Sequence, residues 1–272
     1  MTEIVLDQVA FDYPAGIRAL DGVSLTVPAG QRVALVGQNG SGKTTLVRHL
    51  NGILRPTDGR VLLDGADVAG RTVAQLARTV GLVYQNPDRQ IFASRVRSEV
   101  AFGPRNLGRR GDALRAAVAG ALEATGLSAD ADTNPYDLGG SRRKLLALAS
   151  VLAMETPVLV LDEPTTGQDE RGIDTVARII AGAAASGRTV IAISHDMRFV
   201  AERFERVVVM RLGRIVLDGS PDEVFARDQW DLLRSTFIEP PLAAVVGDRL
   251  GVGSTPTDGV LVAALRSARP RL

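Results

Sequence analysis

A glycine-rich segment near the N-terminus has the residue types and spacing of a phosphate-binding loop. Residues 34–52 read ALVGQNGSGKTTLVRHLNG, and residues 37–44 fit the pattern G-x-x-x-x-G-K-[ST]. Glycines let successive backbone N–H groups converge on a phosphate chain, and a helix that starts here adds unsatisfied donors and a favourable dipole. Lys43 supplies a positive charge for the β- and γ-phosphates, Thr44 a hydroxyl for Mg²⁺, and Thr45 reaches the α-phosphate region. The predicted nucleotide-binding residues are Gly37, Gln38, Asn39, Gly40, Ser41, Gly42, Lys43, Thr44 and Thr45.

Two adjacent carboxylates form the second feature with chemical potential. The stretch VLVLDEP, residues 158–164, is an apolar strand that ends in Asp162 and Glu163. In this position Asp162 can lie near a magnesium ion, and Glu163 can face the γ-phosphate and polarise an attacking water. An Asp-Glu pair after a strand is usually only the solvated start of a loop. Its combination with the phosphate loop favours the catalytic interpretation.

The hydrophobic pattern predicts the elements that must position these residues. Residues 31–37 (QRVALVG), 157–164 (PVLVLDEP) and 188–194 (RTVIAIS) are apolar runs typical of buried parallel strands, and residues 42–52 predict a helix after the first of them. Residues 4–28 alternate as antiparallel strands do. We therefore expect an α/β fold with a mostly parallel sheet as its core and an antiparallel β layer beside it.

The pattern changes in two other parts of the chain. From residue 86 to about 138 it is helical without clear strands, which predicts a helical subdomain at about 86–150 inside the main domain. Residues 206–219 (RVVVMRLGRIVLDG) predict a hairpin. After Pro240 two short amphipathic helices are expected across a linker of Gly, Ser, Thr and Pro. The expected division is a main domain over residues 1–239 and a C-terminal helical extension over 240–272, with dimerisation as its candidate role.

Composition excludes several kinds of protein. The 272 residues are 45% hydrophobic, and 32 Lys and Arg residues balance 31 Asp and Glu residues, so there is no broad basic field for coating nucleic acid. The absence of cysteine excludes disulfides, thiolate zinc sites and thiol catalysis. Neither a signal peptide nor a membrane-spanning apolar run is found, which predicts a cytoplasmic, soluble chain. One of two histidines, His49, lies in the predicted phosphate-loop helix, where a packing or surface role is expected.

Together these residues resemble the ATP-binding cassette (ABC) ATPases, which are P-loop NTPases that use ATP and Mg²⁺. Tyr13, in FDYP, matches the aromatic residue that stacks on adenine, although alone it would be interpreted as a strand aromatic packing on the β layer. Gln85 ends VGLVYQ and matches the Q-loop glutamine, Asp169 matches the D-loop aspartate, and His195 matches the switch histidine, which would hold Glu163 and water in line. The resemblance implies Thr44, Gln85 and Asp162 at the metal, and Glu163, His195 and Gln85 in catalysis.

The signature motif departs from the pattern of that family. There, L-S-G-G-Q at a helix N-terminus contacts the ATP held by a partner subunit. Family spacing from Asp162 places it on Leu138, Gly139, Gly140, Ser141 and Arg142. Backbone donors and the helix dipole survive these changes, but the hydroxyl has moved by two positions. Either Ser141 and Arg142 rebuild the phosphate contact, or the chain lends its partner a weakened half-site. The intact remaining motifs favour hydrolysis with a partner's signature, in a heterodimer.

Several segments are similar to the ATPases of energy-coupling factor (ECF) importers. They are VYQNPDRQIF (residues 83–92), GRIVLDGSPDEVF, ASVLAMETPVLVLDEPTTGQD and the Pro-Pro pair at Pro240. This resemblance implies two ATP molecules at a dimer interface, a transmembrane scaffold protein, a substrate-binding membrane component, and a peripheral location on the cytoplasmic face of the membrane. Vitamin, cobalt or nickel uptake is the implied function. Gln90 and the groove near it would receive coupling helices of the scaffold, the alternative being a polar surface residue.

Three alternatives remain. The chain could serve another ABC transporter, or it could be a soluble ABC protein of DNA repair or translation. The latter usually need a long coiled coil, a zinc module or two cassettes, for which this chain has no room, and no nucleic-acid partner is expected. A non-hydrolysing nucleotide sensor is suggested only by the altered signature, and Glu163 and His195 argue against it.

Overall fold

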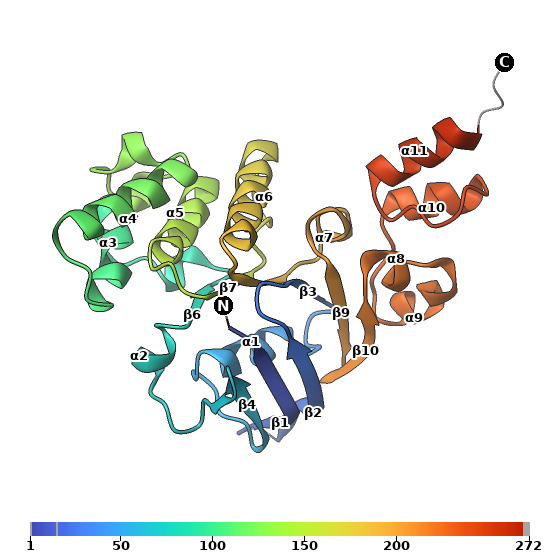
Figure 1. The fold of residues 1–272 in the computed structure, drawn as a ribbon, viewed down its shortest axis with the longest axis horizontal. Coiled ribbons are helices and arrows are strands. Elements are labelled where there is room, and N and C mark those ends of the chain that lie inside the picture. The colour runs from blue at the N-terminus through green and yellow to red at the C-terminus, as the bar shows by residue number, and fades with distance from the viewer. Residues whose placement is uncertain (1, 15, 269–272) are drawn as a thin grey trace.

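The computed structural model describes residues 2–14 and 16–268, and its core is a six-stranded sheet (Figure 1). The strand order is β10-β9-β3-β8-β7-β6, in which all neighbours are parallel except the hairpin of β9 and β10. The predicted parallel core and hairpin are therefore confirmed. The strands are β3 (Arg32–Val36), β6 (Val80–Val83), β7 (Val158–Asp162), β8 (Thr189–Ile193), β9 (Arg206–Arg211) and β10 (Arg214–Gly219).

The sheet places the two sequence features at one edge. Strands β7 and β8 are buried along their whole length, as expected for strands covered on both faces. Strand β8 separates β3 from β7, so the loop after β3 and the carboxylates after β7 emerge two strands apart at the carboxyl edge. Ligands of open α/β sheets bind at this edge. Helix α1 (Lys43–Leu50) follows β3, and α6 (Glu170–Ala185) follows β7.

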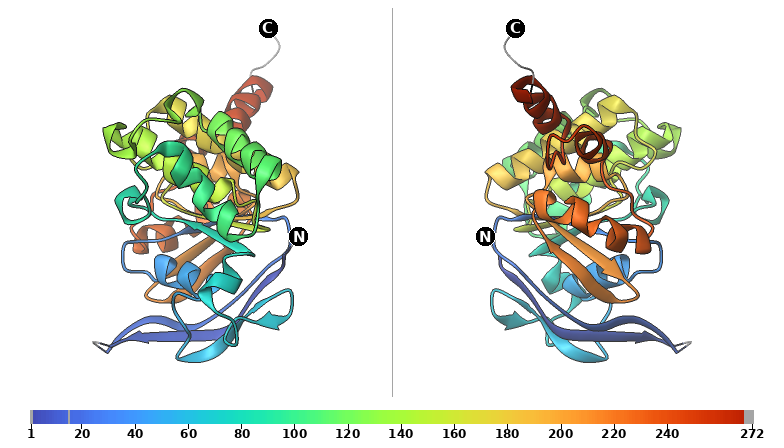
Figure 2. Two further views of the ribbon diagram at one scale, coloured as in Figure 1. Left: turned by 90° about the vertical axis from the view of Figure 1, so that its left-hand side faces the viewer. Right: turned by 90° about the vertical axis from the view of Figure 1, so that its right-hand side faces the viewer.

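A four-stranded antiparallel layer packs against this core. Its order is β2-β1-β4-β5, and Figure 2 shows it on the side of the core sheet opposite the main helices. Buried side chains such as Ile4, Leu20 and Val61 share one apolar cluster with Leu35 of β3 and Leu46 of α1. The layer thus fixes where α1 and its preceding loop lie. Its strands are β1 (Ile4–Tyr13), β2 (Ile17–Val27), β4 (Asp58–Leu63) and β5 (Ala66–Asp67).

The predicted helical insert lies between β6 and β7. Helices α3 (Val96–Asn106), α4 (Gly111–Ala124) and α5 (Gly140–Leu152) pack on one another and form the green lobe of Figure 1. The buried carboxylate of Glu99 accepts hydrogen bonds from the backbone N–H groups of Phe92 and Ala93, which ties the segment after β6 to α3. The chain enters this lobe from the carboxyl end of β6 and leaves it through α5, which leads to the amino end of the next core strand, β7.

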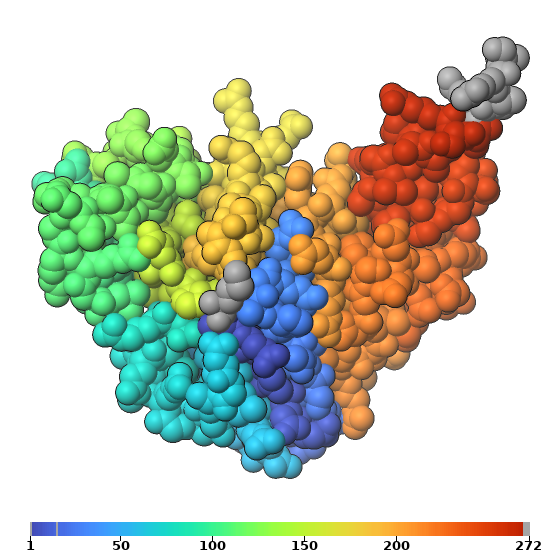
Figure 3. Space-filling model, in the orientation of Figure 1, coloured from blue at the N-terminus to red at the C-terminus, as the bar shows by residue number. Residues whose placement is uncertain are grey.

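The C-terminal part forms short helices at the other side of the molecule. Figure 3 shows this part, in orange and red, separated from the green insert by the core. The two helices after Pro240 agree with the predicted pair. Residues 269–272 of the predicted C-terminal extension lie outside the part of the chain that the structure describes. Among the described residues no helix has the length and apolar character needed to cross a membrane. The helices here are α8 (Pro221–Val224), α9 (Trp230–Ser235), α10 (Leu242–Arg249) and α11 (Asp258–Ala268).

The hydrophobic pattern missed α8 and α9, and it also missed two short helices in the rest of the chain. Helix α2 (Val73–Leu76) is a single turn held by a capping box between Thr72 and Gln75. Helix α7 (Met197–Arg203) is capped by Asp196, whose carboxylate accepts a hydrogen bond from Phe199 N–H. Both are too short to show a helical period.

Candidate active site

The phosphate loop is the turn between β3 and α1. A Cβ on Gly37 would lie 2.2 Å from the carbonyl oxygen of Met210, and a Cβ on Gly42 would lie 2.5 Å from that of Ala19. Since both oxygens belong to the backbone of packed strands, they cannot move aside. Gly42 precedes α1 with a φ of 102°, and in the described part of the chain no side chain caps this helix. The first N–H groups of α1 therefore remain available to an anion.

Lys43 folds back over the loop that precedes it. Its Nζ donates hydrogen bonds to the carbonyl oxygens of Gly37 at 2.6 Å and Gln38 at 2.9 Å. Burial lowers the pKa of this ammonium, and the nearby Glu163 and Asp162 carboxylates oppose the shift. A phosphate would offer the same ammonium a charged acceptor, which forms stronger hydrogen bonds than a carbonyl does.

The two carboxylates lie at the end of β7, as expected. Asp162 accepts a hydrogen bond at 3.2 Å from the hydroxyl of Thr44, so two of the three predicted metal ligands are in contact. Glu163 has a left-handed φ of 53°, which is rare for a residue with a side chain. Its Oε2 accepts a hydrogen bond from the Thr166 hydroxyl at 3.1 Å, and its Oε1 lies 3.1 Å from Nε2 of His195.

Burial sets the charge states at this edge. It raises the pKa of Asp162, against the Thr44 hydrogen bond and the charge of Arg48, and it raises the pKa of Glu163, against the Thr166 hydrogen bond. A raised pKa makes a carboxylate a better acceptor of a proton from water. Burial also lowers the pKa of His195, which favours a neutral imidazole at physiological pH.

The residues present fit a magnesium ion that binds together with a nucleotide. The Thr44 hydroxyl and the Asp162 carboxylate are oxygen donors, and the amide of Gln85 lines the same cavity. Across residues 2–14 and 16–268, no cluster of three or more His, Cys, Asp or Glu side chains could hold a metal alone. Mg²⁺ characteristically uses one or two protein ligands plus phosphates and water. When bound, it would neutralise phosphate charge.

One cavity of about 610 Å³ collects most of the predicted site. It contains Tyr13, the loop from Asn39 to Thr45, Gln85, both carboxylates and His195. Gly37 and Gln38 contribute through their carbonyl contacts with Lys43. The signature residues and Asp169 do not line this cavity. It also includes Ile17, Arg18, Ala19 and Thr166, which the sequence did not single out.

Tyr13 lines the cavity and packs against Phe11. Its hydroxyl is 3.1 Å from that of Thr45, and Phe11 meets both the Tyr13 and the His49 rings edge-on. His49 is fully buried, with Nδ1 2.7 Å from the carbonyl oxygen of Thr45. Packing, one of the two roles expected for His49, is therefore confirmed. Adenine stacking on Tyr13 stays a prediction.

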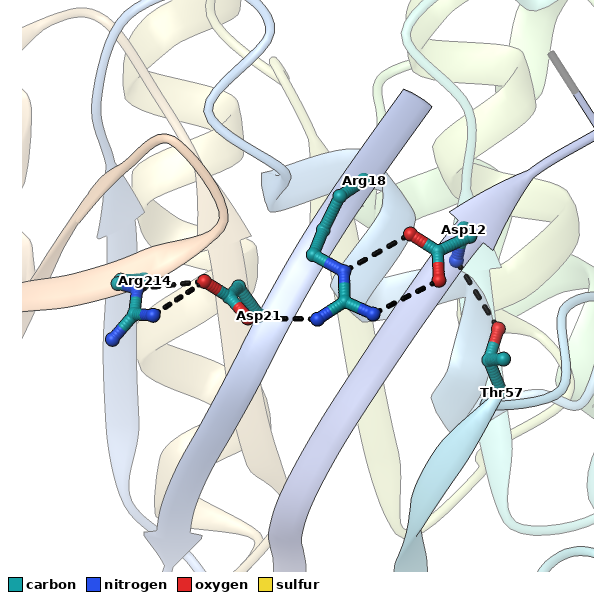
Figure 4. A network of polar contacts seen from close by, with 5 residues as sticks. All are labelled: Asp12, Arg18, Asp21, Thr57 and Arg214. Carbon is teal, nitrogen blue, oxygen red and sulfur yellow. Dashed lines mark hydrogen bonds and ion pairs between the residues drawn. The ribbon is translucent and has the colours of Figure 1, made fainter. Parts of the chain in front are cut away.

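Arg18, which also lines the cavity, belongs to a polar network (Figure 4). Arg18 contacts Asp12 with two nitrogens and Asp21 with a third, and Asp21 also binds Arg214 of β10. Asp12 N–H donates to the hydroxyl of Thr57. These hydrogen bonds raise the pKa of Arg18 and lower those of Asp12 and Asp21. The network joins the antiparallel layer to the core sheet beside Tyr13. Thr57 and Arg214 are far in sequence from the other three residues, so no local pattern indicated the whole network.

The altered signature segment begins α5, with Gly139 as the N-cap. The hydroxyl of Ser141 donates to Oε1 of Gln168 at 2.6 Å, and Gln168 Nε2 donates to the Ser141 carbonyl at 3.1 Å. Arg142 contacts the Asp130 carboxylate. Both new side chains are thus engaged within this chain. Asp169, the predicted D-loop residue, caps α6 by accepting from Gly172 N–H at 2.8 Å.

The side chain of Gln90 makes hydrogen bonds inside the helical insert. Its Oε1 accepts from Tyr84 N–H at 3.1 Å, and its Nε2 donates to the Ala147 carbonyl at 2.7 Å and to Ser150. The side chain is therefore not the free polar surface group considered as one alternative. Two exposed aromatic residues of the insert, Phe92 and Phe102, pack edge-on with ring centroids 4.7 Å apart.

Known proteins match this chain over most of its length. The family model described as ABC transporter matches residues 20–166. The energy-coupling factor transporter ATP-binding protein EcfA of Methanothermobacter thermautotrophicus is 40% identical over 257 residues, which cover 94% of this chain and 82% of that protein. EcfA2 of Symbiobacterium thermophilum, of the same description, is 42% identical over 254 residues, covering 91% and 88%.

A solved structure agrees with the sequence relatives. CbiO1 of Clostridium perfringens, described as part of the ABC transporter complex CbiONQ, superposes with a TM-score of 0.75 at 34% identity. The match covers 85% of this chain and 93% of that one. These matches agree with the fold, the phosphate loop and the carboxylate pair described above. The chain belongs to the ATP-binding proteins of ABC transporters, is an ABC-type ATPase, and resembles the ECF branch of that family.

Proposed function

We propose that this chain powers an ECF-type importer of a vitamin or a transition-metal ion, as one of two ATPase subunits that close around two ATP molecules. The observation that carries the proposal is the single cavity that joins the phosphate loop, Asp162, Glu163, Gln85 and His195. The relatives named as ECF ATP-binding proteins support the transporter class. In this role Glu163 polarises water, His195 and Gln85 orient it, and Thr44, Gln85 and Asp162 hold Mg²⁺.

The composition of the cavity supports the proposal of a second ATPase subunit. Helix α5 presents its N-terminus at Gly139 and Gly140, where a Cβ would meet open space, yet this helix end does not line the chain's own cavity. A second helix N-terminus at the phosphates, in addition to that of α1, would therefore come from another ATPase. Since Ser141 and Arg142 are engaged internally, the half-site that this chain offers in return is weakened. These contacts favour a heterodimer with one strong and one weak site.

The membrane scaffold would dock on the helical insert. Phe92 and Phe102 remain 59% and 48% exposed, and such an apolar pair on a surface favours a protein partner. Phe92 belongs to the same segment as Gln85, residues 83–92, so a scaffold helix seated on it would contact the chain close to the Q-loop. Replacing Phe92 by aspartate should release the scaffold while ATP binding is retained. The chain would then lie peripherally on the cytoplasmic face of the membrane.

The test is purification of the tagged chain from its native membranes in mild detergent, with mass spectrometry of the copurifying proteins. We expect a transmembrane scaffold, a small substrate-binding membrane protein and a second ATPase. The identity of the small membrane protein would indicate the imported compound. Recovery of only nucleic-acid-binding or ribosomal proteins would overturn the transporter role and leave the ATPase assignment in place.

A further inference from the structure

Lysine is rare in this chain, and both lysines lie at the nucleotide edge. Of the 32 Lys and Arg residues, only Lys43 and Lys144 are lysines. Lys43 belongs to the phosphate loop. Lys144 lies in the second turn of α5, outside the motifs that define the site, and it does not line the nucleotide cavity. Its ammonium nevertheless reaches the loop that carries Glu163.

Lys144 holds the backbone of that loop at two points. Its Nζ donates to the carbonyl oxygen of Thr166 at 2.5 Å and lies 3.4 Å from that of Glu163. Thr166 in turn donates its hydroxyl to Oε2 of Glu163 at 3.1 Å. A compact ammonium with three donors suits two converging carbonyls. One continuous series of contacts therefore runs from α5 through Thr166 to the carboxylate.

The loop needs such support because Glu163 is strained. A non-glycine residue with a φ of 53° persists only when its surroundings hold it in place. On the sheet side, Glu163 N–H donates to the Ile193 carbonyl at 3.0 Å. On the insert side, the contact comes from Lys144. Burial lowers the pKa of Lys144, and the charges of the Glu163 and Asp162 carboxylates oppose this shift.

A second contact holds the same helix to the same loop one turn earlier. Ser141 and Gln168 exchange two hydrogen bonds, as described above. Gly172 makes room for this pair, since a Cβ there would lie 2.1 Å from Oε1 of Gln168. Helix α5 is thus attached to the loop at Thr166 and at Gln168. A displacement of the insert would pull on the segment that fixes the Glu163 side chain.

We propose that Lys144 is a positioning residue for Glu163: it fixes Thr166, and through it the carboxylate, according to the position of α5. This inference rests on the proposed role of Glu163 in activating water. It gives the helical insert, which would contact the membrane scaffold, a direct connection to the hydrolytic step. That connection is separate from the Q-loop.

The experiment is a double-mutant cycle on the assembly purified through the tagged full-length chain. Lys144→Met keeps the length of the side chain without its donors, and Thr166→Val keeps the shape without the hydroxyl. We expect each to lower kcat about 10-fold or more, because small misplacements of reacting groups have effects of that size. The KM for ATP should stay within about twofold for Lys144→Met, since Lys144 is outside the cavity.

The double variant and a conservative variant distinguish positioning from a general structural role. If Lys144 acts through Thr166, the double variant loses no more kcat than the worse single variant. Lys144→Arg should restore most of the activity that Lys144→Met loses, because it keeps the donors. Unchanged kcat in Lys144→Met, additive losses, or a raised KM at unchanged kcat would each overturn the proposal. Thermal denaturation and ATP binding confirm that each variant is folded.

Glu163→Gln, measured in parallel, separates the two levels of inference. If this variant is inactive while Lys144→Met is fully active, only the positioning role fails. If Glu163→Gln retains turnover, the proposed role of Glu163 fails, whatever Lys144→Met shows.

Discussion

Replacing Gly37 by alanine tests the geometry of the phosphate loop. The new Cβ would lie 2.2 Å from the Met210 carbonyl oxygen and 2.8 Å from the Ser41 hydroxyl oxygen. The neighbouring pair Val36 and Val209 joins β3 to β9, so the backbone cannot yield without disturbing the sheet. Overpacking of a dense interior costs about 1–3 kcal/mol. The φ of 144° adds roughly another 1–3 kcal/mol for a residue with a side chain.

A loop that shifts to relieve this strain no longer fits the phosphates. If about 2 kcal/mol of this strain energy is subtracted from the binding free energy, the Kd for Mg-ATP rises roughly 30-fold. Isothermal titration calorimetry measures this, with thermal denaturation to verify folding. Gly40→Ala is the matched control: its φ is 81°, but a Cβ there meets open space, so only the backbone cost applies. Affinity within twofold of the wild type in Gly37→Ala would refute the reasoning.

Three further predictions concern two residues that line the cavity and the proposed partner ATPase. Tyr13→Ala should raise the KM for ATP about 10-fold at similar kcat, because stacking of a base contributes about 1–3 kcal/mol. Tyr13→Phe keeps the ring and should change the KM little. Steady-state kinetics measure both variants, and an equal rise in KM for the two would contradict stacking. Arg18→Ala should lower the melting temperature more at low than at high salt, because salt screens the exposed ion pairs that Arg18 makes with Asp12 and Asp21. The same decrease at both salt concentrations would contradict this prediction. ATP turnover should be low for the isolated chain and rise on mixing with the copurified second ATPase, so full activity of the isolated chain would contradict the shared site.

The sequence predicted those parts of the site that depend on local chemistry. Gly42, Lys43 and Thr44 follow one strand, and Asp162 and Glu163 end another, so strand–loop–helix order alone indicated one edge of a parallel sheet. The fold class and its helical insert could be predicted for the same reason. Why Gly37 must be glycine could not be predicted, because the obstructing carbonyl belongs to Met210 on a strand near the end of the cassette.

Contacts between side chains of separate helices, strands and loops could not be predicted from the sequence either. Gln90 is placed near the Q-loop, as its position in the chain suggests, but only the packed insert shows its amide engaged with Ala147 and Ser150. The pairing of Ser141 with Gln168 likewise depends on how α5 meets the loop after β7. For Lys144 a signal existed, since a chain that otherwise uses arginine has lysine there. Its contact with Thr166 still required the folded structure.

ATP binding and turnover by Glu163→Gln in the purified assembly test the central claim most directly. The substitution keeps the shape of the side chain and its hydrogen bond with Thr166, but removes the carboxylate that would polarise water. We predict a Kd for Mg-ATP within about twofold of the wild type, and a turnover lower by about 100-fold or more. Retained turnover with unchanged binding would contradict the claim that this carboxylate drives hydrolysis.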